Sequence, residues 1–304
     1  MSIVEKAAEK LKALPAESPT APQAEAAPLH TAPTVERLQD RTRVGDRPAD
    51  RPAEPAATYH LDRLALKRKG LLPADNDADG RLADELRRIK RPLLNNAMGK
   101  GAETFARGNR ILVTSAEAGE GKTFAAVNLA LSLAREADFE VLLVDGDIPK
   151  SDITQVFGLD GKPGLMDVVA DEQLVPAEVI IRTDVPNLLV VPAGKYHPLA
   201  AELFRSRRME YVMDELGGRN RRRLLVFDSA PLLVTTESHV LASHMGQVVV
   251  MVAAGRTRQQ ALNTAVQSLS ELQFIGLVLN MSRLPPTEDY FKRSYHPRAL
   301  EGEV

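Results

Sequence analysis

Residues 111–130 constrain the fold of this chain more than any other stretch. A short apolar run, ILVTS at 111–115, leads into the turn AEAGEGKT at 116–123, and an apolar pattern of helical period follows. Strand, glycine-bearing loop and helix in this order are the context that a phosphate-binding loop requires. Gly119 and Gly121 let the backbone N–H groups point at a phosphate, and the start of the helix adds its positive dipole end. The segment therefore predicts a site for a phosphorylated ligand.

Two side chains at the end of this loop are those that a nucleotide site uses. We expect Lys122 to reach the β- and γ-phosphates and Thr123 to ligate Mg²⁺. Ala116 stands where the usual pattern has its first glycine, and a small residue still permits the turn. The alternative is a glycine-rich turn with an incidental lysine. The predicted nucleotide contacts are Ala118, Gly119, Glu120, Gly121, Lys122, Thr123 and Phe124.

Apolar runs of strand length alternate with helical patterns through the rest of the chain. After the loop helix, strands are expected at 139–147, 187–194, 221–231, 247–253 and 274–281, and the helices between them include 199–216, 237–245 and 257–272. Such alternation gives a parallel sheet with helices on both faces. We therefore predict an α/β fold of the P-loop NTPase class in a domain that spans 81–284.

Three acids, Asp145, Asp147 and Asp228, come at the ends of two of these strands. The carboxyl ends of parallel strands meet at the ligand edge of an open sheet. Asp228 is suited to hold Mg²⁺ opposite Thr123, as a Walker B acid does. Asp145 and Asp147 would repel one another without a cation nearby, so we expect one to bind the metal and the other to accept a proton from a hydroxyl. The alternative is that they cap the following helix or turn.

These roles give two predicted sets of residues. The metal ligands are Thr123, Asp145 and Asp228, and the catalytic residues are Lys122, Asp145, Asp147 and Asp228.

The last predicted strand favours adenine over guanine. Guanine-specific loops of this build use an Asn-Lys-x-Asp element, whereas this chain has LNMS at 279–282, without an acid to pair with guanine. We therefore expect ATP with Mg²⁺, and we expect Asn280 to contact adenine.

The first 80 residues differ in composition from the predicted domain. Residues 1–14 form an amphipathic helical pattern, and 15–58 are rich in proline, alanine and charge, which predicts a disordered linker. Residues 59–80 are expected to be an extended arm that packs on the domain or on a neighbour. The balanced charges of the first helix favour a protein partner over a membrane surface, and the alternative is a frayed terminus.

Bulk composition excludes several function classes. The formal charge of −2 gives no general attraction to nucleic acid, cysteine is absent, and the apolar runs are too short to span a bilayer. The first residues lack the continuous apolar core of a secretory signal. We expect a cytoplasmic protein with no membrane span and no nucleic-acid partner.

These motifs together resemble the bacterial tyrosine kinases of polysaccharide synthesis, which share the P-loop fold of the MinD and ParA ATPases. Residues 116–123 are similar to their Walker A motif, 141–147 to their additional Walker A′ motif and 224–228 to their Walker B motif. The N-terminal helix, the linker and the RRIKRPLL run at 87–94 look most like the stand-alone branch associated with exosortase-linked exopolysaccharide loci.

The resemblance also gives a meaning to a charged stripe on a predicted helix that begins at residue 81. Glu85, Arg88 and Arg91 recur at a three-residue spacing, which usually means only solvation or pairing within the helix. They are similar to the Glu-x-x-Arg-x-x-Arg element through which these kinases associate into rings. The resemblance therefore implies a homo-oligomer with these residues at its interface.

The activity that the resemblance implies is ATP-dependent protein-tyrosine phosphorylation that regulates exopolysaccharide polymerisation or export. The acceptors would be Tyr290 and Tyr295, in the flexible tail at 285–304, delivered in trans by a ring neighbour. The activator would be a separate membrane-anchored chain-length determinant protein that recruits the kinase to the inner face of the membrane.

Departures from the family pattern leave two alternatives open. The tail has two tyrosines instead of a run, and Ile148, Pro149 and Lys150 stand where many relatives have arginines. An ATP-gated scaffold without transfer is one alternative. A MinD- or ParA-like ATPase switch is the other, although those proteins carry an additional lysine at the position of Glu117.

Overall fold

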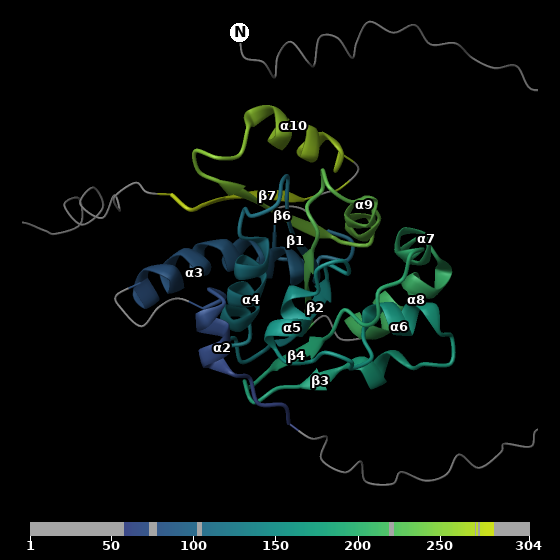
Figure 1. Cartoon of the computed structure of the whole chain (residues 1–304). Coiled ribbons are helices and arrows are strands. Elements are labelled where there is room, and N and C mark those ends of the chain that lie inside the picture. The colour runs from purple at the N-terminus through teal and green to yellow at the C-terminus, as the bar shows by residue number, and fades with distance from the viewer. Residues whose placement is uncertain are drawn as a thin grey trace, which may run out of the picture. The chain divides into compact units, whose positions relative to one another are not determined.

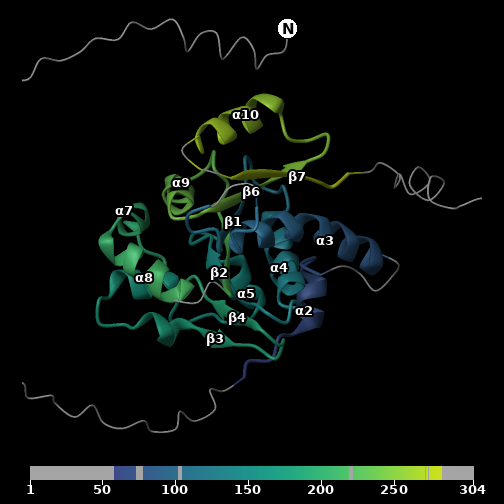
Figure 2. The same ribbon diagram turned by 180° about the vertical axis from the view of Figure 1, so that it is seen from behind.

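The computed structural model describes residues 58–72, 78–101, 105–218, 222–270, 272 and 274–282. The predicted N-terminal helix at 1–14, all but the last residue of the linker at 15–58, and the tail with Tyr290 and Tyr295 lie outside the described residues. The described part is a sheet with helices packed on both faces, as the two views in Figure 1 and Figure 2 show.

The strands of the described residues form one sheet in the order β3-β4-β2-β5-β1-β6-β7. Their bounds are β1 Arg110–Ser115, β2 Glu140–Gly146, β3 Ile181–Arg182, β4 Leu188–Val191, β5 Arg223–Ser229, β6 Gln247–Ala253 and β7 Ile275–Asn280. All neighbouring pairs of strands are parallel except the β3–β4 pair, which is antiparallel. The predicted fold class is therefore confirmed. The edge strand β3 was not predicted, because two residues carry too little pattern.

The helices differ from the predicted ones mainly at their ends. Their bounds are α2 Arg63–Arg68, α3 Ala78–Ala97, α4 Lys122–Leu133, α5 Asp152–Val156, α6 Leu165–Ala170, α7 Ala200–Phe204, α8 Arg207–Gly217, α9 Thr236–Ser243 and α10 Gln259–Gln267. The helix predicted over 199–216 is wrong in being continuous: Ser206 is extended, its hydroxyl accepts the Met209 N–H, and α8 starts there. None of the described helices is both long and apolar enough to cross a membrane.

Alternate side chains of the strands supply two hydrophobic cores. Ile111 and Val113 of β1 pack with α2, α3, α4 and α5, on what we call the α4 face. Leu112 packs on the opposite α8 face with α6 to α10. Every residue of β1 is buried, as expected for a central parallel strand covered on both sides.

The predicted arm packs on its own domain. The Tyr59 N–H donates to the Arg182 carbonyl at 2.8 Å, and the Tyr59 carbonyl accepts from the Asp184 N–H at 2.9 Å, so the arm extends the sheet beside β3. It is not extended throughout, because α2 follows. Its buried leucines in the α4-face core are Leu61, Leu66 and Leu71.

A buried amide pair anchors the end of α3 to the start of β6. Asn96 donates from Nδ2 to Gln247 Oε1 at 2.8 Å. Gln247 in turn donates from Nε2 to the carbonyls of Leu93 and Gly108, at 3.0 and 2.5 Å. Both side chains are buried, so each polar atom depends on these partners rather than on water.

We expect Asn96→Ala to lower the free energy of unfolding by about 1–3 kcal/mol, because it leaves Gln247 Oε1 buried without a donor. Urea unfolding followed by circular dichroism measures the change. The control is Asn95→Ala, at a half-buried neighbour for which no such bond is present, where a change within about 0.5 kcal/mol is expected. Equal effects of the two substitutions would contradict the anchor.

Candidate functional site

The loop between β1 and α4 has the backbone shape of a phosphate cradle. Gly119 and Gly121 adopt φ values of +79° and +90°, which glycine accepts without strain. A Cβ atom on Gly121 would lie 2.2 Å from Asn280 Nδ2, so a larger residue would displace that side chain and would be strained at this positive φ. Since α4 begins at Lys122, the loop leads directly into a helix N-terminus, which favours a bound anion.

The buried Glu120 side chain braces this loop from inside. Its Oε2 accepts the Glu117 N–H at 2.9 Å, and its Oε1 accepts from the Thr257 hydroxyl. Its carbonyl accepts from Asn280 Nδ2 at 2.9 Å. The loop is thus tied to the connection after β6 and to the end of β7. The predicted nucleotide contacts of Glu120 and Asn280 stay predictions, whereas the bracing contacts were missed.

The three predicted acids gather where β2 and β5 end. Asp145 of β2 lies directly opposite Asp228 of β5, and Asp228 lies opposite Val113 of β1, the strand that enters the loop. Asp147 follows just after β2 ends. All three carboxylates are almost completely buried, at 0–1% exposure. The three acids therefore lie together at one edge of the sheet, as we expected from the sequence.

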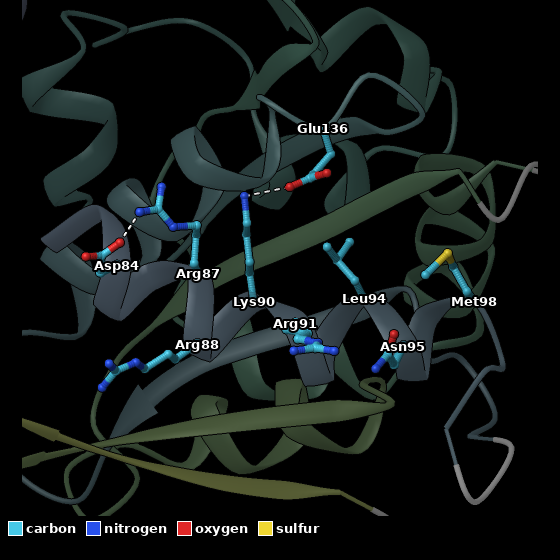
Figure 3. Close-up of a pocket in the computed structure, with 9 residues that line it drawn as sticks. All are labelled: Asp84, Arg87, Arg88, Lys90, Arg91, Leu94, Asn95, Met98 and Glu136. Carbon is cyan, nitrogen blue, oxygen red and sulfur yellow. Dashed lines mark hydrogen bonds and ion pairs between the residues drawn. The ribbon is translucent and has the colours of Figure 1, made fainter. Parts of the chain in front are cut away.

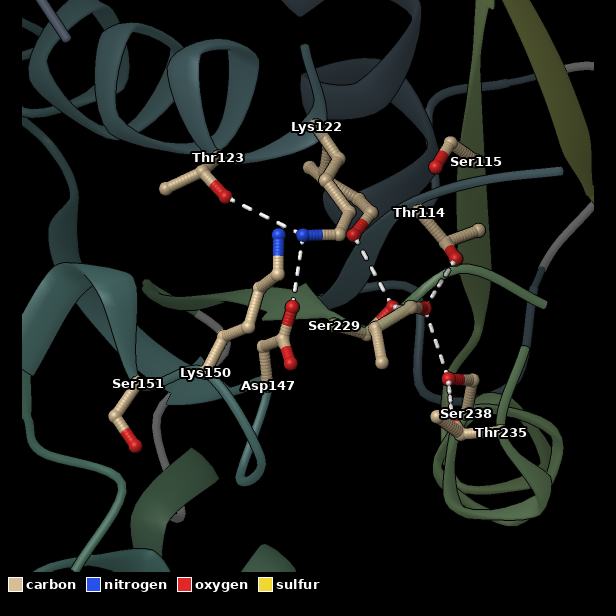
Figure 4. A network of polar contacts seen from close by, with 12 residues as sticks. Thr114, Ser115, Lys122, Thr123, Asp147, Lys150, Ser151, Ser229, Thr235 and Ser238 are labelled. Carbon is tan, nitrogen blue, oxygen red and sulfur yellow. Dashed lines mark hydrogen bonds and ion pairs between the residues drawn. The ribbon is translucent and has the colours of Figure 1, made fainter. Parts of the chain in front are cut away.

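Asp147 pairs with the loop lysine. Lys122 Nζ donates to Asp147 Oδ2 at 2.8 Å and lies 3.5 Å from the Thr123 hydroxyl (Figure 4). Burial by itself would lower the pKa of Lys122, but the charges of Asp228 and Asp147 and the bond to Asp147 raise it overall. The lysine is therefore held in its charged form.

Asp145 faces the next helix. Its Oδ2 accepts from the N–H and the hydroxyl of Thr154 in α5, at 2.8 and 2.7 Å, while the Thr154 Oγ1 accepts the Ala193 N–H at 2.9 Å. This contact matches the alternative in which an acid holds the following helix. Its Oδ1 is buried without a partner. Burial raises the pKa of Asp145 to about 6, although the bonds from Thr154 oppose the shift.

Asp228 is the least satisfied group of the site. Both of its carboxylate oxygens are buried, and neither has a hydrogen-bond partner. Burial raises the pKa of Asp228 to about 8, because desolvation outweighs the attraction of Lys122 and the nearby Thr123 hydroxyl. A cation beside this carboxylate would remove the penalty.

The donor set fits Mg²⁺ that is shared with a phosphorylated ligand. Mg²⁺ is usually bound by one or two carboxylates together with substrate phosphates. Asp228 offers two orphaned oxygens and Asp145 one, with Thr123 in the first turn of α4. Among the described residues, no cluster of three or more His, Cys, Asp or Glu side chains could hold a metal by itself. A phosphorylated ligand would supply further oxygen ligands.

The predicted interface residues lie on the outer side of α3. Glu85, Arg88 and Arg91 are all exposed. Beside α3 is an open hollow of about 620 Å³ (Figure 3). Its lining residues are Asp84, Arg87, Arg88, Lys90, Arg91, Leu94, Asn95, Met98 and Glu136.

The cations of this hollow divide into paired and unpaired ones. Arg87 bonds to Asp84, and Lys90 pairs with Glu136 at 2.6 Å. Within the described ranges, Arg88 and Arg91 make no hydrogen bond or ion pair. Among the described residues, these two guanidinium groups of the hollow therefore have no ion-pair partner.

Two other predicted nucleotide contacts lie on the loop and in the first turn of α4. Ala118 is exposed on the loop, and Phe124 is half-buried against the α4-face core. Their contacts with a nucleotide stay predictions.

Comparison with known proteins gives a consistent set of relatives. Residues 108–275 match the family model described as an AAA domain. The chain is 31% identical to EpsB of Ralstonia nicotianae over 142 residues, which are 46% of this chain and 18% of EpsB. It is 29% identical to the tyrosine-protein kinase CpsD of Streptococcus agalactiae over 155 residues, 50% of this chain and 66% of CpsD. The chain thus spans only part of the length of these relatives.

Solved structures share the fold. The VpsO kinase domain aligns with a TM-score of 0.54 and 26% identity, over 66% of this chain and 98% of that one. The chimeric protein CapA2B2 aligns with a TM-score of 0.58 and 22% identity, over 75% and 95%, which concerns the fold alone. The predicted resemblance to bacterial tyrosine kinases is confirmed by these matches.

We expect Asp228→Asn to stabilise the protein at pH 8 in the absence of nucleotide and magnesium. The pKa of Asp228 rises from 3.8 to about 8 on folding. The unfolded chain therefore loses this proton first, and the wild type loses stability as the pH rises from about 4 to 8. Removing the ionisable group should gain on the order of 1 kcal/mol or more at pH 8 and flatten this dependence.

Urea unfolding in EDTA at pH 5 and pH 8 measures the difference. Asp160→Asn, at an exposed acid, is the matched control and should change neither value. A loss of stability in Asp228→Asn at pH 8 would contradict the assignment of Asp228 as a buried, uncompensated acid.

Proposed function

The chain belongs to the AAA-domain family, and from this membership and the geometry of the loop we propose that it is an ATP-dependent protein-tyrosine kinase. Its relatives include tyrosine-protein kinases from several bacteria. The chain spans only part of several of these proteins. Its activity, substrate and partners are therefore proposals and are not taken over from the whole relatives.

One observation carries the proposal. The buried Asp228 carboxylate has no hydrogen-bond partner, and it lies near a lysine at the N-terminus of a helix. Both oxygens are orphaned, and the charge of Asp228 acts on Lys122, the first residue of α4. A polar group without a partner at such depth is costly unless a ligand completes it. A magnesium–nucleotide complex supplies both the cation for Asp228 and the phosphate for the loop.

Each residue of the loop then has a defined task. Lys122 would leave Asp147 and contact the β- and γ-phosphates, while Thr123 and Asp228 would hold Mg²⁺. When bound, Mg²⁺ neutralises charge that develops on the transferred phosphoryl group. Since phenols are already acidic, positioning and charge neutralisation carry most of the rate.

Asp147 is the better placed of the two candidate proton acceptors. Asp145 already accepts two bonds from Thr154, whereas Asp147 becomes available when Lys122 turns to the phosphates. In the transfer, the tyrosine oxygen bonds to the γ-phosphorus as the bond to the bridging oxygen breaks. ADP leaves, and the phenolic proton passes to the carboxylate and then to water.

The α3 hollow supports the proposed association into a ring. Arg88 and Arg91 expose two cations with no hydrogen bond or ion pair in the described part of the chain, and a neighbour with an acidic surface would neutralise them. In such a ring, Tyr290 and Tyr295 of one subunit would serve as acceptors at the site of the next. These tyrosines lie outside the described residues.

The biological setting rests on the family resemblance. We place the kinase in the regulation of exopolysaccharide polymerisation and export, at the inner face of the cell membrane. Its activator would be a membrane-anchored chain-length determinant protein. The ATPase-switch alternative is less favoured, because the exposed Glu117 puts a negative charge where those switches carry a lysine.

We expect Lys122→Met to lower phosphotyrosine formation by roughly 100-fold or more, because it removes the cation that neutralises the transferred group. Mass spectrometry after incubation with Mg·ATP, with and without the cytoplasmic segment of the activator, measures this. ATP-dependent dimerisation and hydrolysis without phosphotyrosine in the wild type would instead identify the switch. Nucleotide binding without either would identify the scaffold.

We expect the double substitution Arg88→Ala and Arg91→Ala to weaken self-association by roughly tenfold or more, because it removes both unpaired cations. Sedimentation velocity over a concentration series gives the change. Arg87→Ala, which removes a guanidinium already bonded to Asp84, is the matched control and should have a small effect. If the control weakens association as much as the double variant, the assignment of the interface is wrong.

A further inference from the structure

The turn after β2 fixes a second lysine near the loop. The Lys150 and Ser151 N–H groups both donate to the Asp147 carbonyl, at 3.1 and 2.7 Å. The Lys150 carbonyl accepts from the Gln155 side chain at 2.7 Å. The backbone of Lys150 is therefore held from both sides, and its position relative to Asp147 is set by the fold.

The side chain of Lys150 extends from this turn toward the loop. Figure 4 shows it directed toward Lys122, Thr123 and Asp147. Lys150 is an exposed residue, and across the described ranges its ammonium group has no hydrogen bond or ion pair. The carboxylate of Asp147, three residues earlier in the chain, is bonded to Lys122 instead. Asp152, two residues later, makes no ion pair with Lys150 among the described residues.

The ammonium groups of Lys122 and Lys150 thus approach the space beside Asp147 from two different elements. Lys122 comes from the start of α4, and Lys150 comes from the turn before α5. Like charges that converge repel one another unless an anion lies between them or beside both. Asp147 is bonded to Lys122, and neither Asp145 nor Asp228 is bonded to Lys150. The anion that the rest of this site is shaped to hold is the phosphate chain of a nucleotide, since the loop glycines and the start of α4 point there.

The direction of approach favours the terminal phosphate. Lys122 reaches the site from the loop, whereas Lys150 comes from the turn after Asp147, at the end of β2, the side on which the proposed transfer would take place. A cation on this side meets the group that a triphosphate has and a diphosphate lacks. It would therefore distinguish ATP from ADP.

We propose that Lys150 is a second phosphate-binding cation of this site, which contacts the terminal phosphate of a bound nucleoside triphosphate. The proposal rests on the proposed nucleotide site and adds a positioning residue to it.

The test compares Lys150→Met, Lys150→Arg and the control Lys162→Met, at an exposed lysine in the loop after α5. Isothermal titration calorimetry measures the affinity of each for Mg²⁺ with a non-hydrolysable ATP analogue and for Mg·ADP. Lys150→Met should lose about tenfold in affinity for the triphosphate, as expected for a hydrogen bond to a charged group, and less than about twofold for ADP. Lys150→Arg should recover most of the loss, and Lys162→Met should match the wild type.

Three results would overturn the proposal: unchanged triphosphate affinity in Lys150→Met, equal losses for triphosphate and diphosphate, or an equal loss in Lys162→Met. The first would mean that Lys150 is only a solvated lysine, and the others a general effect of charge or folding. If the wild type bound neither nucleotide, the proposed function itself would fail. If it bound both normally and Lys150→Met did too, only this inference would fail.

Discussion

Three carboxylates are buried together against a single lysine, and the arrangement of the sheet depends on how that charge is balanced. The register that sets Asp145 opposite Asp228 is imposed by the hydrogen bonds between β2 and β5, so the acids cannot separate without breaking the sheet. Thr154 satisfies one of them and Lys122 another. Asp228 keeps two orphaned oxygens in the interior. Stability is thus given up at Asp228, the point of the core at which we propose that a cation and a phosphate bind.

The parts of this arrangement that follow from local pattern could be predicted from the sequence. The order of strand, glycine loop and helix specifies the phosphate cradle, and the apolar runs that end in Asp145 and Asp228 specify which strand tips carry acids. Once the sheet is parallel, these tips must lie at one edge, so the gathering of the acids follows from topology. The fold class and the meeting of Lys122 with the acids needed no information beyond this.

The remaining details depend on contacts between distant residues. Glu120 reads as one more loop residue, yet its carboxylate bonds to Thr257, 137 positions further along the chain. The different contacts of Asp145 and Asp147 are set by Thr154 and by the end of β2 at Gly146, neither of which has a sequence signature. At Ser206 the apolar pattern of a continuous helix is interrupted, because the serine side chain caps the start of α8 and the backbone there is extended. Contacts of Asn280 with adenine and phosphorylation of the tail tyrosines stay predictions.

The contact between α3 and α4 has a mechanical consequence. Lys90 of α3 donates to the Ser132 carbonyl in the last turn of α4 and pairs with Glu136 just beyond it, while the first turn of α4 carries Lys122 and Thr123. A helix of 12 residues is a stiff rod about 18 Å long. In the proposed ring, a force applied by a neighbouring subunit at α3 would act on one end of this rod, and the proposed phosphate site lies at its other end. The proposed assembly and the proposed nucleotide binding would then be coupled through a single rigid element rather than through a relay of flexible side chains.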